Sequence, residues 1–148
     1  MTEINQNSLA EESTSVQIHL GILQNVIARM ASNSASSKTW CITIVSTVLV
    51  IVADKGKSDF IILALIPIIL FCALDTYYLA MEKGFRASYE TFVGKIHRQS
   101  LTLEDLYLVK LEGNQIKLHI ESLKSFSVWG FYVLVALLVI AVKFFGLV

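Results

Sequence analysis

The sequence predicts an all-α integral membrane protein with three transmembrane helices and amphipathic cytoplasmic helices. Hydrophobic residues make up 55% of the 148 residues, and charged residues only 16%, below the roughly 25% of soluble domains. The mean hydropathy is +0.64. Three apolar runs begin near residues 39, 60 and 126 and are separated by polar segments. At this length, one domain is expected.

The first thirty residues contain no apolar run long enough to cross a membrane. Residues 1–14 are polar and acidic, which predicts a disordered tail. Residues 15–32 are predicted to form an amphipathic cytoplasmic helix, because apolar residues from Val16 to Met30 recur at spacings of three and four. Its polar face lacks the Lys and Arg cluster of surface-binding helices, so we expect it to pack on another cytoplasmic helix.

Residues 33–81 are predicted to form a transmembrane hairpin, with spans at about 36–54 and 60–81 and a charged turn at 54–59. The uncharged run at 39–53 reaches only about 22 Å as a helix, short of a hydrocarbon core of roughly 30 Å. We therefore expect the small polar residues at 33–37 to continue this helix. Pro67 lies at the centre of the second span and predicts a kink there.

Residues 82–125 are predicted to be a cytoplasmic helical segment whose first part prolongs the second span. An apolar stripe from Phe85 to Ile96 has helical spacing, and a second helical stretch is expected from Ser100 or Thr102 to Leu111. Gly113-Asn114 indicates a turn. Residues 126–147 are the third predicted transmembrane helix, with aromatic anchors at its entrance.

The basic residues indicate the orientation, because cytoplasmic loops are enriched in Lys and Arg. A cytoplasmic N-terminus and a periplasmic C-terminus place nine of the twelve basic residues in the cytoplasm. The reverse orientation would require the seven cations of residues 82–125 to be translocated.

An acid within a predicted span, Asp75, needs a partner or a wet cavity. Lys38 lies sixteen residues before Asp54, and Asp75 lies sixteen after Asp59, so a hairpin places them at the same depth. We predict a polar latch of Lys38 and Asp75, with Arg29 as the second candidate partner. The alternative is that Asp75 merely marks the membrane interface.

The first span carries small hydroxyl residues that permit close helix approach. Three spans cannot enclose a polar path alone, so any ion path requires several copies. The candidates for an oligomer contact or pore lining are Thr39, Thr43, Ser46 and Thr47. Ordinary helix packing is the alternative. The candidates for contact with a cytoplasmic protein partner are His19, Gln24, Asn33, Glu82 and Arg86.

The sequence shows no motif of an enzyme, so no catalytic residue is predicted. The three histidines and two cysteines do not have the spacing of metal ligands, and we predict neither a metal site nor a cofactor. The net charge is zero, which argues against a nucleic-acid partner. The predicted partners are the lipid bilayer, further copies of the chain and a cytoplasmic protein.

Two blocks, residues 18–45 and 73–90, together resemble a group of small, functionally uncharacterised bacterial multi-pass membrane proteins. In that group an amphipathic helix precedes a Lys–Trp span start, and an acidic and aromatic run closes the second span. The group is similar to the membrane components of anti-phage defence systems. This resemblance implies that several copies of the chain assemble and breach the bacterial inner membrane. The positions that carry the resemblance are Arg29, Asn33, Ser34, Lys38, Trp40, Asp75, Tyr78, Glu82 and Arg86.

These observations favour a homo-oligomeric inner-membrane effector or sensor subunit that perturbs membrane integrity in a bacterial defence or stress response. The alternative is a non-conducting membrane anchor or scaffold that recruits a cytoplasmic protein. A transporter subunit is a third hypothesis, but no repeated pair of broken helices is visible.

Overall fold

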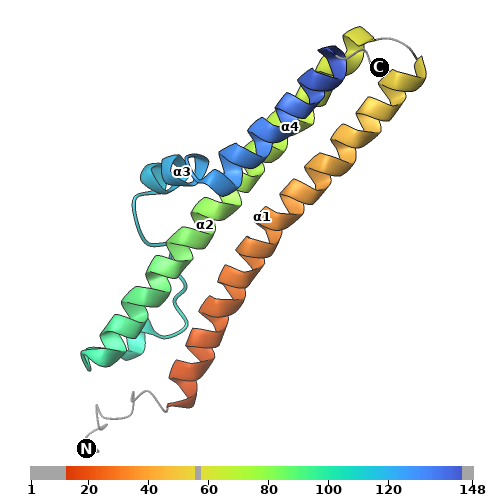
Figure 1. Cartoon of the computed structure of the whole chain (residues 1–148). Helices are drawn as coiled ribbons and strands as arrows, with labels where there is room; N and C mark the ends of the chain where they lie inside the picture. Colours follow the sequence, from red (N-terminus) through yellow and green to blue (C-terminus); the bar gives the residue numbers. More distant parts are fainter. Residues whose placement is uncertain (1–12, 56–57, 145–148) are drawn as a thin grey trace, which may run out of the picture.

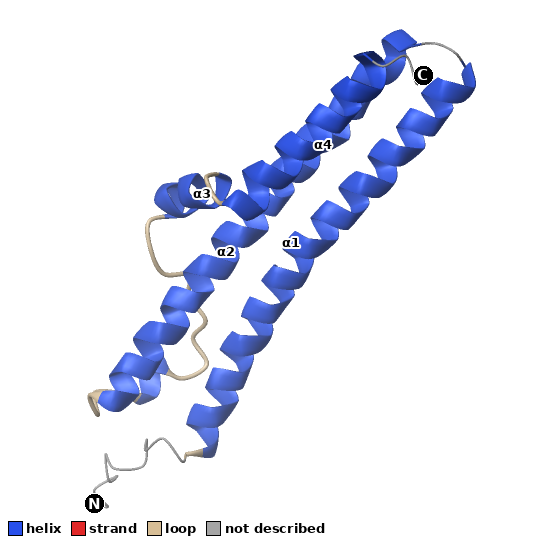
Figure 2. Cartoon of the chain, in the orientation of Figure 1, coloured by secondary structure: helices blue, strands red, loops and turns tan. Residues whose placement is uncertain are grey.

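The computed structural model describes residues 13–55 and 58–144, and within them the chain is all-α without strands (Figure 2). The elements are α1 (Thr14–Lys55), the 3-10 helix η2 (Ser58–Ala64), α2 (Leu65–His97), the 3-10 helix η3 (Leu103–Asp105), α3 (Gln115–Leu123) and α4 (Phe126–Phe144). Three of the helices are long and apolar enough to cross a membrane. The predicted fold class is confirmed.

The first long helix, α1, runs without interruption through residues that the sequence analysis divided between a cytoplasmic helix and a first span. The expectation that residues 33–37 continue the helix agrees with this structure. These residues contain neither Gly nor Pro, and the Ser37 hydroxyl donates to the Asn33 carbonyl at 3.0 Å, one helical turn back. The 42 residues extend about 63 Å, well beyond a hydrocarbon core of roughly 30 Å.

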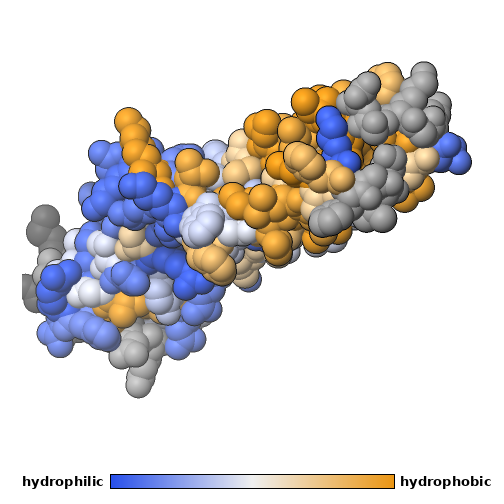
Figure 3. Space-filling view, turned by 45° about the horizontal axis from the view of Figure 1, so that its top comes forward, coloured by the Kyte–Doolittle hydropathy of each residue, from blue (hydrophilic) through white to orange (hydrophobic). Residues whose placement is uncertain are grey.

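The helices α1 and α2 lie side by side and antiparallel, and α4 packs on α2 along one half of this pair (Figure 1). The surface divides into two parts, one hydrophilic and one hydrophobic (Figure 3). We call residues 13–38 and 75–125 the polar half, and residues 39–55, 58–74 and 126–144 the apolar half. Because α1 and α2 cross the border between the halves as continuous helices, the two halves are mechanically joined.

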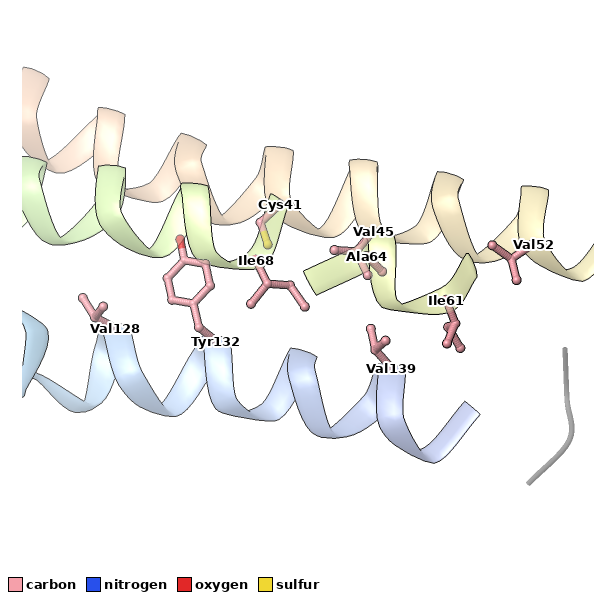
Figure 4. Packing of buried hydrophobic residues seen from close by; sticks show 9 residues of the cluster. All are labelled: Cys41, Val45, Val52, Ile61, Ala64, Ile68, Val128, Tyr132 and Val139. Carbon is pink, nitrogen blue, oxygen red and sulfur yellow. The ribbon is translucent and has the colours of Figure 1, made fainter. Parts of the chain in front are cut away.

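The core of the apolar half is formed by small and branched side chains from α1, η2, α2 and α4 (Figure 4). Cys41 is fully buried there, and Cys72 packs against the same cluster. The two cysteines therefore share one cluster across the hairpin. Tyr132 and Val139 bring α4 onto the pair formed by α1 and α2.

The sequence analysis expected Pro67 at the centre of a helix, but the structure shows it as the third residue of α2. Backbone N–H groups in the first turn of an α-helix have no partner within that helix, so a proline is tolerated there. The change in helix geometry precedes Pro67, as the 3-10 segment η2.

The core of the polar half joins α1 to α2. Val16 and Leu23 of α1 are buried with Phe92 of α2, and Tyr89 and Ile96 pack against them. The apolar stripes predicted on residues 15–32 and 85–96 therefore face each other. The predicted packing of the N-terminal amphipathic helix on another helix is what the structure shows.

The connecting segment, residues 98–114, contains turns and the short 3-10 helix η3 but no α-helix, so the helical stretch expected from Ser100 or Thr102 to Leu111 is wrong. α2 ends in a Schellman motif, with Gln99 at a φ of 53° and the Ser100 N–H donating to the Lys95 carbonyl at 3.0 Å. In this segment, hydrogen bonds to α2, such as that from the Glu112 N–H to the Gly84 carbonyl, take the place of hydrogen bonds within a helix. Gly113, with a φ of 101°, and Asn114, which caps α3, form the predicted turn.

Some predictions fall outside the described residues. They are most of the tail at residues 1–14, the centre of the charged turn at residues 56–57, and the end of the third span at residues 145–147.

We predict that Gly84→Ala loosens the connecting segment. A Cβ atom at Gly84 would lie 2.7 Å from Cγ of Leu111 and 3.3 Å from the backbone oxygen of Glu112. Overpacking of this kind costs about 1–3 kcal/mol, which corresponds to about 5-fold to 150-fold in the opening equilibrium. Hydrogen–deuterium exchange of residues 106–112 in the detergent-solubilised chain measures it.

The matched control is Gly21→Ala, because a Cβ atom at Gly21 meets nothing within 4 Å. Both substitutions gain the same helix propensity, so only the contact differs between them. Equal exchange rates of residues 106–112 in the two variants would contradict the close approach of this segment to α2.

Candidate functional site

The predicted pairing of Lys38 with Asp75 is present in the structure. Asp75 is fully buried, and its Oδ2 lies 2.6 Å from Nζ of Lys38, whose side chain is 21% exposed. The Ser34 hydroxyl donates to Oδ1 of Asp75 at 2.5 Å, and Nζ of Lys38 lies 3.4 Å from the Ser34 hydroxyl. We call these three residues the border cluster, because the polar and apolar halves meet at them.

The border cluster follows from simple helical geometry. Ser34 and Lys38 are one turn apart on α1, so their side chains share a face. Asp75 on the antiparallel α2 meets that face at the same distance from the end of the hairpin. The contacts therefore confirm the equal-depth argument made from the sequence.

The third long helix also reaches this region. The Tyr132 hydroxyl of α4 donates to the Phe71 carbonyl at 3.0 Å and lies close enough to Asp75 to interact with it electrostatically. Three helices thus surround one carboxylate. A buried carboxylate is costly unless it is paired and hydrogen-bonded, and here both conditions are met.

Arg29, the second partner predicted for Asp75, does not take part in the border cluster. It is exposed and lies nine residues before Lys38, about 13 Å along the helix. Among the ion pairs of the described residues, the one to Asp75 comes from Lys38. This part of the predicted latch is wrong, because Arg29 lies about two and a half helical turns from the residue that pairs with Asp75.

The hydroxyl residues of the first span lie on the outer surface of α1. Thr39, Thr43, Ser46 and Thr47 are all exposed in the single chain. The threonine hydroxyls donate to carbonyls of their own helix, as Thr43 does to Thr39 at 3.0 Å and Thr47 does to Thr43 at 2.8 Å. These residues therefore do not pack on α2, and their outward face is open to lipid or to another copy.

His19 holds the connecting segment against the helices. The ring is 2% exposed and packs on Phe92, with the ring centroids 4.3 Å apart. Its Nδ1 accepts the backbone N–H of Tyr107 at 2.9 Å. Tyr107 has a φ of 62°, a conformation uncommon for residues other than glycine. His19 was a candidate for contact with a partner protein, but its side chain is occupied within the chain.

Polar side chains around His19 line a small cavity of about 190 Å³. Lys95 and Asp105 form an ion pair there, with 2.6 Å between Nζ and Oδ1. The hydrogen bond from Lys95 lowers the pKa of Asp105, outweighing the opposing effect of its burial. Burial lowers the pKa of His19, and the negative charge of Asp105 opposes this shift.

Two further hydrogen bonds tie the end of the connecting segment to α2. Ser88 donates to the Lys110 carbonyl at 2.8 Å, and Thr91 donates to the Glu112 carboxylate at 2.5 Å. The sequence analysis did not identify these residues. Their spacing of three on α2 places both on one face, but sequence alone does not reveal that an extended segment lies along it.

Of the remaining candidates for a partner contact, Gln24 and Arg86 are exposed, whereas the side chain of Glu82 is only 12% exposed. Gln24 and Arg86 line an open groove of about 520 Å³ between α1 and α2, together with Ile27, Ala28, Ala31, Tyr89 and Glu90. Arg86 also pairs with Glu82 one turn away at 2.8 Å. Asn33 is half-buried, close to the border cluster. The groove combines an apolar floor from α1 with charged groups from α2.

Comparison with known proteins yields no relative from which a function could be carried over. No protein-family model, no curated protein and no solved structure matches the chain.

We predict that Lys38→Met destabilises the protein by about 3 kcal/mol, because it leaves the Asp75 carboxylate buried without its cation. Removing one partner of a buried ion pair costs about 3–5 kcal/mol, and we expect the lower value because the Lys38 side chain is partly exposed to solvent. Unfolding of the purified chain by titration with a denaturing detergent measures the effect. Arg29→Met is the matched control and should change stability by less than about 0.5 kcal/mol. Equal losses in both variants would exclude the specific role of Lys38.

We predict that acid loosens the connecting segment below a pH of about 6.5, the ordinary His pKa. The pKa of His19 is lower in the folded protein than in the unfolded chain, so folding favours the neutral ring. The contribution of the neutral ring to stability is fully present above pH 6.5 and is lost as the pH falls toward the lowered pKa of the folded protein. Protonation also turns Nδ1 into a donor, which cannot accept from Tyr107.

Hydrogen exchange of residues 106–112 as a function of pH, corrected for the intrinsic exchange rate, measures this change. His19→Asn is the control, because an amide oxygen accepts a hydrogen bond without titrating. The pH dependence between 6.5 and the lowered pKa should disappear in that variant. Its persistence would show that another group is responsible.

Proposed function

We propose that this chain is a homo-oligomeric effector or sensor subunit of the bacterial inner membrane, which perturbs membrane integrity in a defence or stress response. The observation that carries the proposal is the buried ion pair of Lys38 and Asp75 at the border of the two halves. A charged pair at this depth is expensive, and such pairs within membrane helices mark functional sites by default.

The continuity of α1 and α2 supports a switching role for the border cluster. A change in the polar half that moves α1 relative to α2 acts directly on the distance between Lys38 and Asp75, because no hinge separates them. Opening the pair would expose two charges at the membrane border and draw in water. Two packings that differ by a few kcal/mol suffice for such a switch.

The outward face of α1 supports assembly of several copies. Thr39, Thr43 and Thr47 form a row of small residues whose hydroxyls are satisfied within their own helix. Such residues allow close approach of a neighbouring helix. In the proposed assembly this face lies against further copies or lines a path between them.

The distribution of charge supports a cytoplasmic N-terminus and a periplasmic C-terminus. The polar half holds nine of the twelve basic residues, and positively charged segments are retained in the cytoplasm. In this orientation the connecting segment and the groove beside Gln24 and Arg86 face the cytoplasm, where a signal would arrive.

The assignment to defence rests on the resemblance of residues 18–45 and 73–90 to small bacterial membrane proteins. Lys38, Ser34 and Asp75 belong to the positions that carry the resemblance, and they form the border cluster. The part of the chain that looks familiar is thus the part that contains the buried charges.

Induced expression tests the proposal. Expression in bacteria together with the products of neighbouring genes should depolarise the membrane, as measured with a potential-sensitive dye. Asp75→Asn should change the extent of depolarisation, because it removes one charge of the ion pair while keeping the size of the side chain. A membrane potential that never changes under these conditions would refute an effector role.

The assembly is tested separately by the mass of the detergent-solubilised particle. Thr43→Phe should reduce the number of copies, because a large side chain prevents close helix approach. Ile69→Phe is the control, since Ile69 is 71% exposed on α2, outside the proposed contact. A monomeric wild-type particle would exclude the oligomer.

A non-conducting anchor is the second candidate function, and the groove lined by Gln24, Ile27 and Arg86 favours it. An amphipathic helix of a soluble partner could lay its apolar face on Ile27 and pair with Arg86 or Glu90. Recovery of one soluble partner in fixed ratio, lost in Ile27→Asp and without any change in potential, would favour the anchor over the effector.

A further inference from the structure

The short helix α3 lies beside the bundle, at an angle to α2 and next to the beginning of α4 (Figure 1). α4 has 19 residues and spans about 28 Å, close to the thickness of the hydrocarbon core. Its first turn therefore lies at a membrane boundary. α3 ends at Leu123 and α4 begins at Phe126, so α3 lies at the same boundary.

One side of α3 is fixed to the bundle. Ser122 is fully buried, and the rings of His119 and Tyr77 of α2 lie 6.0 Å apart. Leu118 and His119 are half-buried. These residues, at spacings of three and four, form a single face of the helix. α3 is thus held in place by α2 rather than tethered loosely.

A second side of α3 is apolar and uncovered in the single chain. Ile116, Ile120 and Leu123 also recur at spacings of four and three, and they are 73%, 49% and 50% exposed. At 100° per residue, this side lies about 120° around the helix from the buried side. The apolar surface continues directly into α4, where Phe126 and Trp129 are 77% and 47% exposed.

The third side of α3 is charged. Lys117 and Glu121 lie one turn apart, with 3.8 Å between Nζ and Oε1. The charged side is separated from the apolar side by about 110°. A helix with a packed, an apolar and a charged side suits a position where protein, lipid and water meet.

We propose that α3 is an interfacial helix whose apolar side lies in the bilayer at the boundary between headgroups and acyl chains. The occupant of this surface is lipid, because the exposed apolar side chains are continuous with Phe126 and Trp129, the lipid-facing entrance of a membrane-spanning helix. Amphipathic helices bind such interfaces through their apolar side. A fully solvated position for this side would leave Ile116, Ile120 and Leu123 in water.

The balance of charge on α3 indicates how it binds. Lys117 is offset by Glu121, which leaves Lys124 at the C-cap as a single net positive charge, so attraction to anionic headgroups contributes little. Burial of apolar surface drives the contact, and it should depend only weakly on the lipid headgroup charge. The helix would then hold the entrance of α4 at a fixed depth and place the connecting segment just outside the bilayer.

Depth measurements with spin labels test this inference. Single cysteines replace Ile116, Ile120, Lys117 and Glu121 in the full chain carrying Cys41→Ala and Cys72→Ala, reconstituted in phosphatidylcholine vesicles with and without phosphatidylglycerol. The ratio of collision with oxygen to collision with a water-soluble nickel complex should be severalfold higher at 116 and 120 than at 117 and 121. Leu138→Cys, on the surface of α4, is the reference for a lipid-exposed site.

Equal access of the nickel complex to all four positions on α3 would overturn the inference. Magnetic broadening at 116 and 120 that disappears on dilution with unlabelled chain would also overturn it, in favour of a second copy. Should the cysteine-free background lose its helicity, the same labels are attached to the wild-type background, where Cys41 is buried and Cys72 is packed in the apolar core. Membrane potential does not enter this readout, and the dilution separates a contact between copies from burial in lipid, so the inference can fail while the proposed function holds.

Discussion

The ion pair between Lys38 and Asp75 fixes how the two longest helices lie against each other. In the apolar half, branched side chains would tolerate a range of registers, since cores accept many arrangements of similar volume. A shift of one turn, about 5.4 Å, would separate Nζ from Oδ2, which now lie 2.6 Å apart, and leave a buried carboxylate without its cation. The charges therefore select one arrangement of the hairpin from many that hydrophobic packing alone would allow.

The polar half depends on that arrangement. Only with α1 and α2 in this register does His19 reach Tyr107 of the connecting segment while Phe92 packs on its ring. The segment itself has little regular structure and is held by side chains of α2, notably Ser88 and Thr91. It is therefore held by a few local hydrogen bonds, whereas the helices beneath it are continuous with the membrane spans. A displacement of α1 or α2 in the polar half would therefore act directly on the border cluster, because both helices continue through it.

The sequence was sufficient to predict those features of the fold that depend on the periodicity and the hydropathy of the residues. It predicted the three spans, the facing apolar stripes and the level pair of Lys38 and Asp75, because each depends on spacing along a helix. It failed for residues 100–111, where the apolar spacing resembled that of a helix, but hydrogen bonds to α1 and α2, from Tyr107 to His19 and from Ser88 to Lys110, hold the segment in an irregular conformation. It also misplaced Arg29 and His19, because their partners depend on which side chains a distant segment brings near. Ser34 could have been found from its position one turn before Lys38.

The most direct test of the account is a double-mutant cycle of Lys38→Met and Asp75→Leu, with unfolding in a denaturing detergent as the readout. If the pair fixes the hairpin, the double variant should be more stable than the sum of the single losses implies, by about 2 kcal/mol, since removing both charges leaves none buried alone. Losses that add to within about 0.5 kcal/mol would mean that the two charges do not interact, and the border cluster would lose its role.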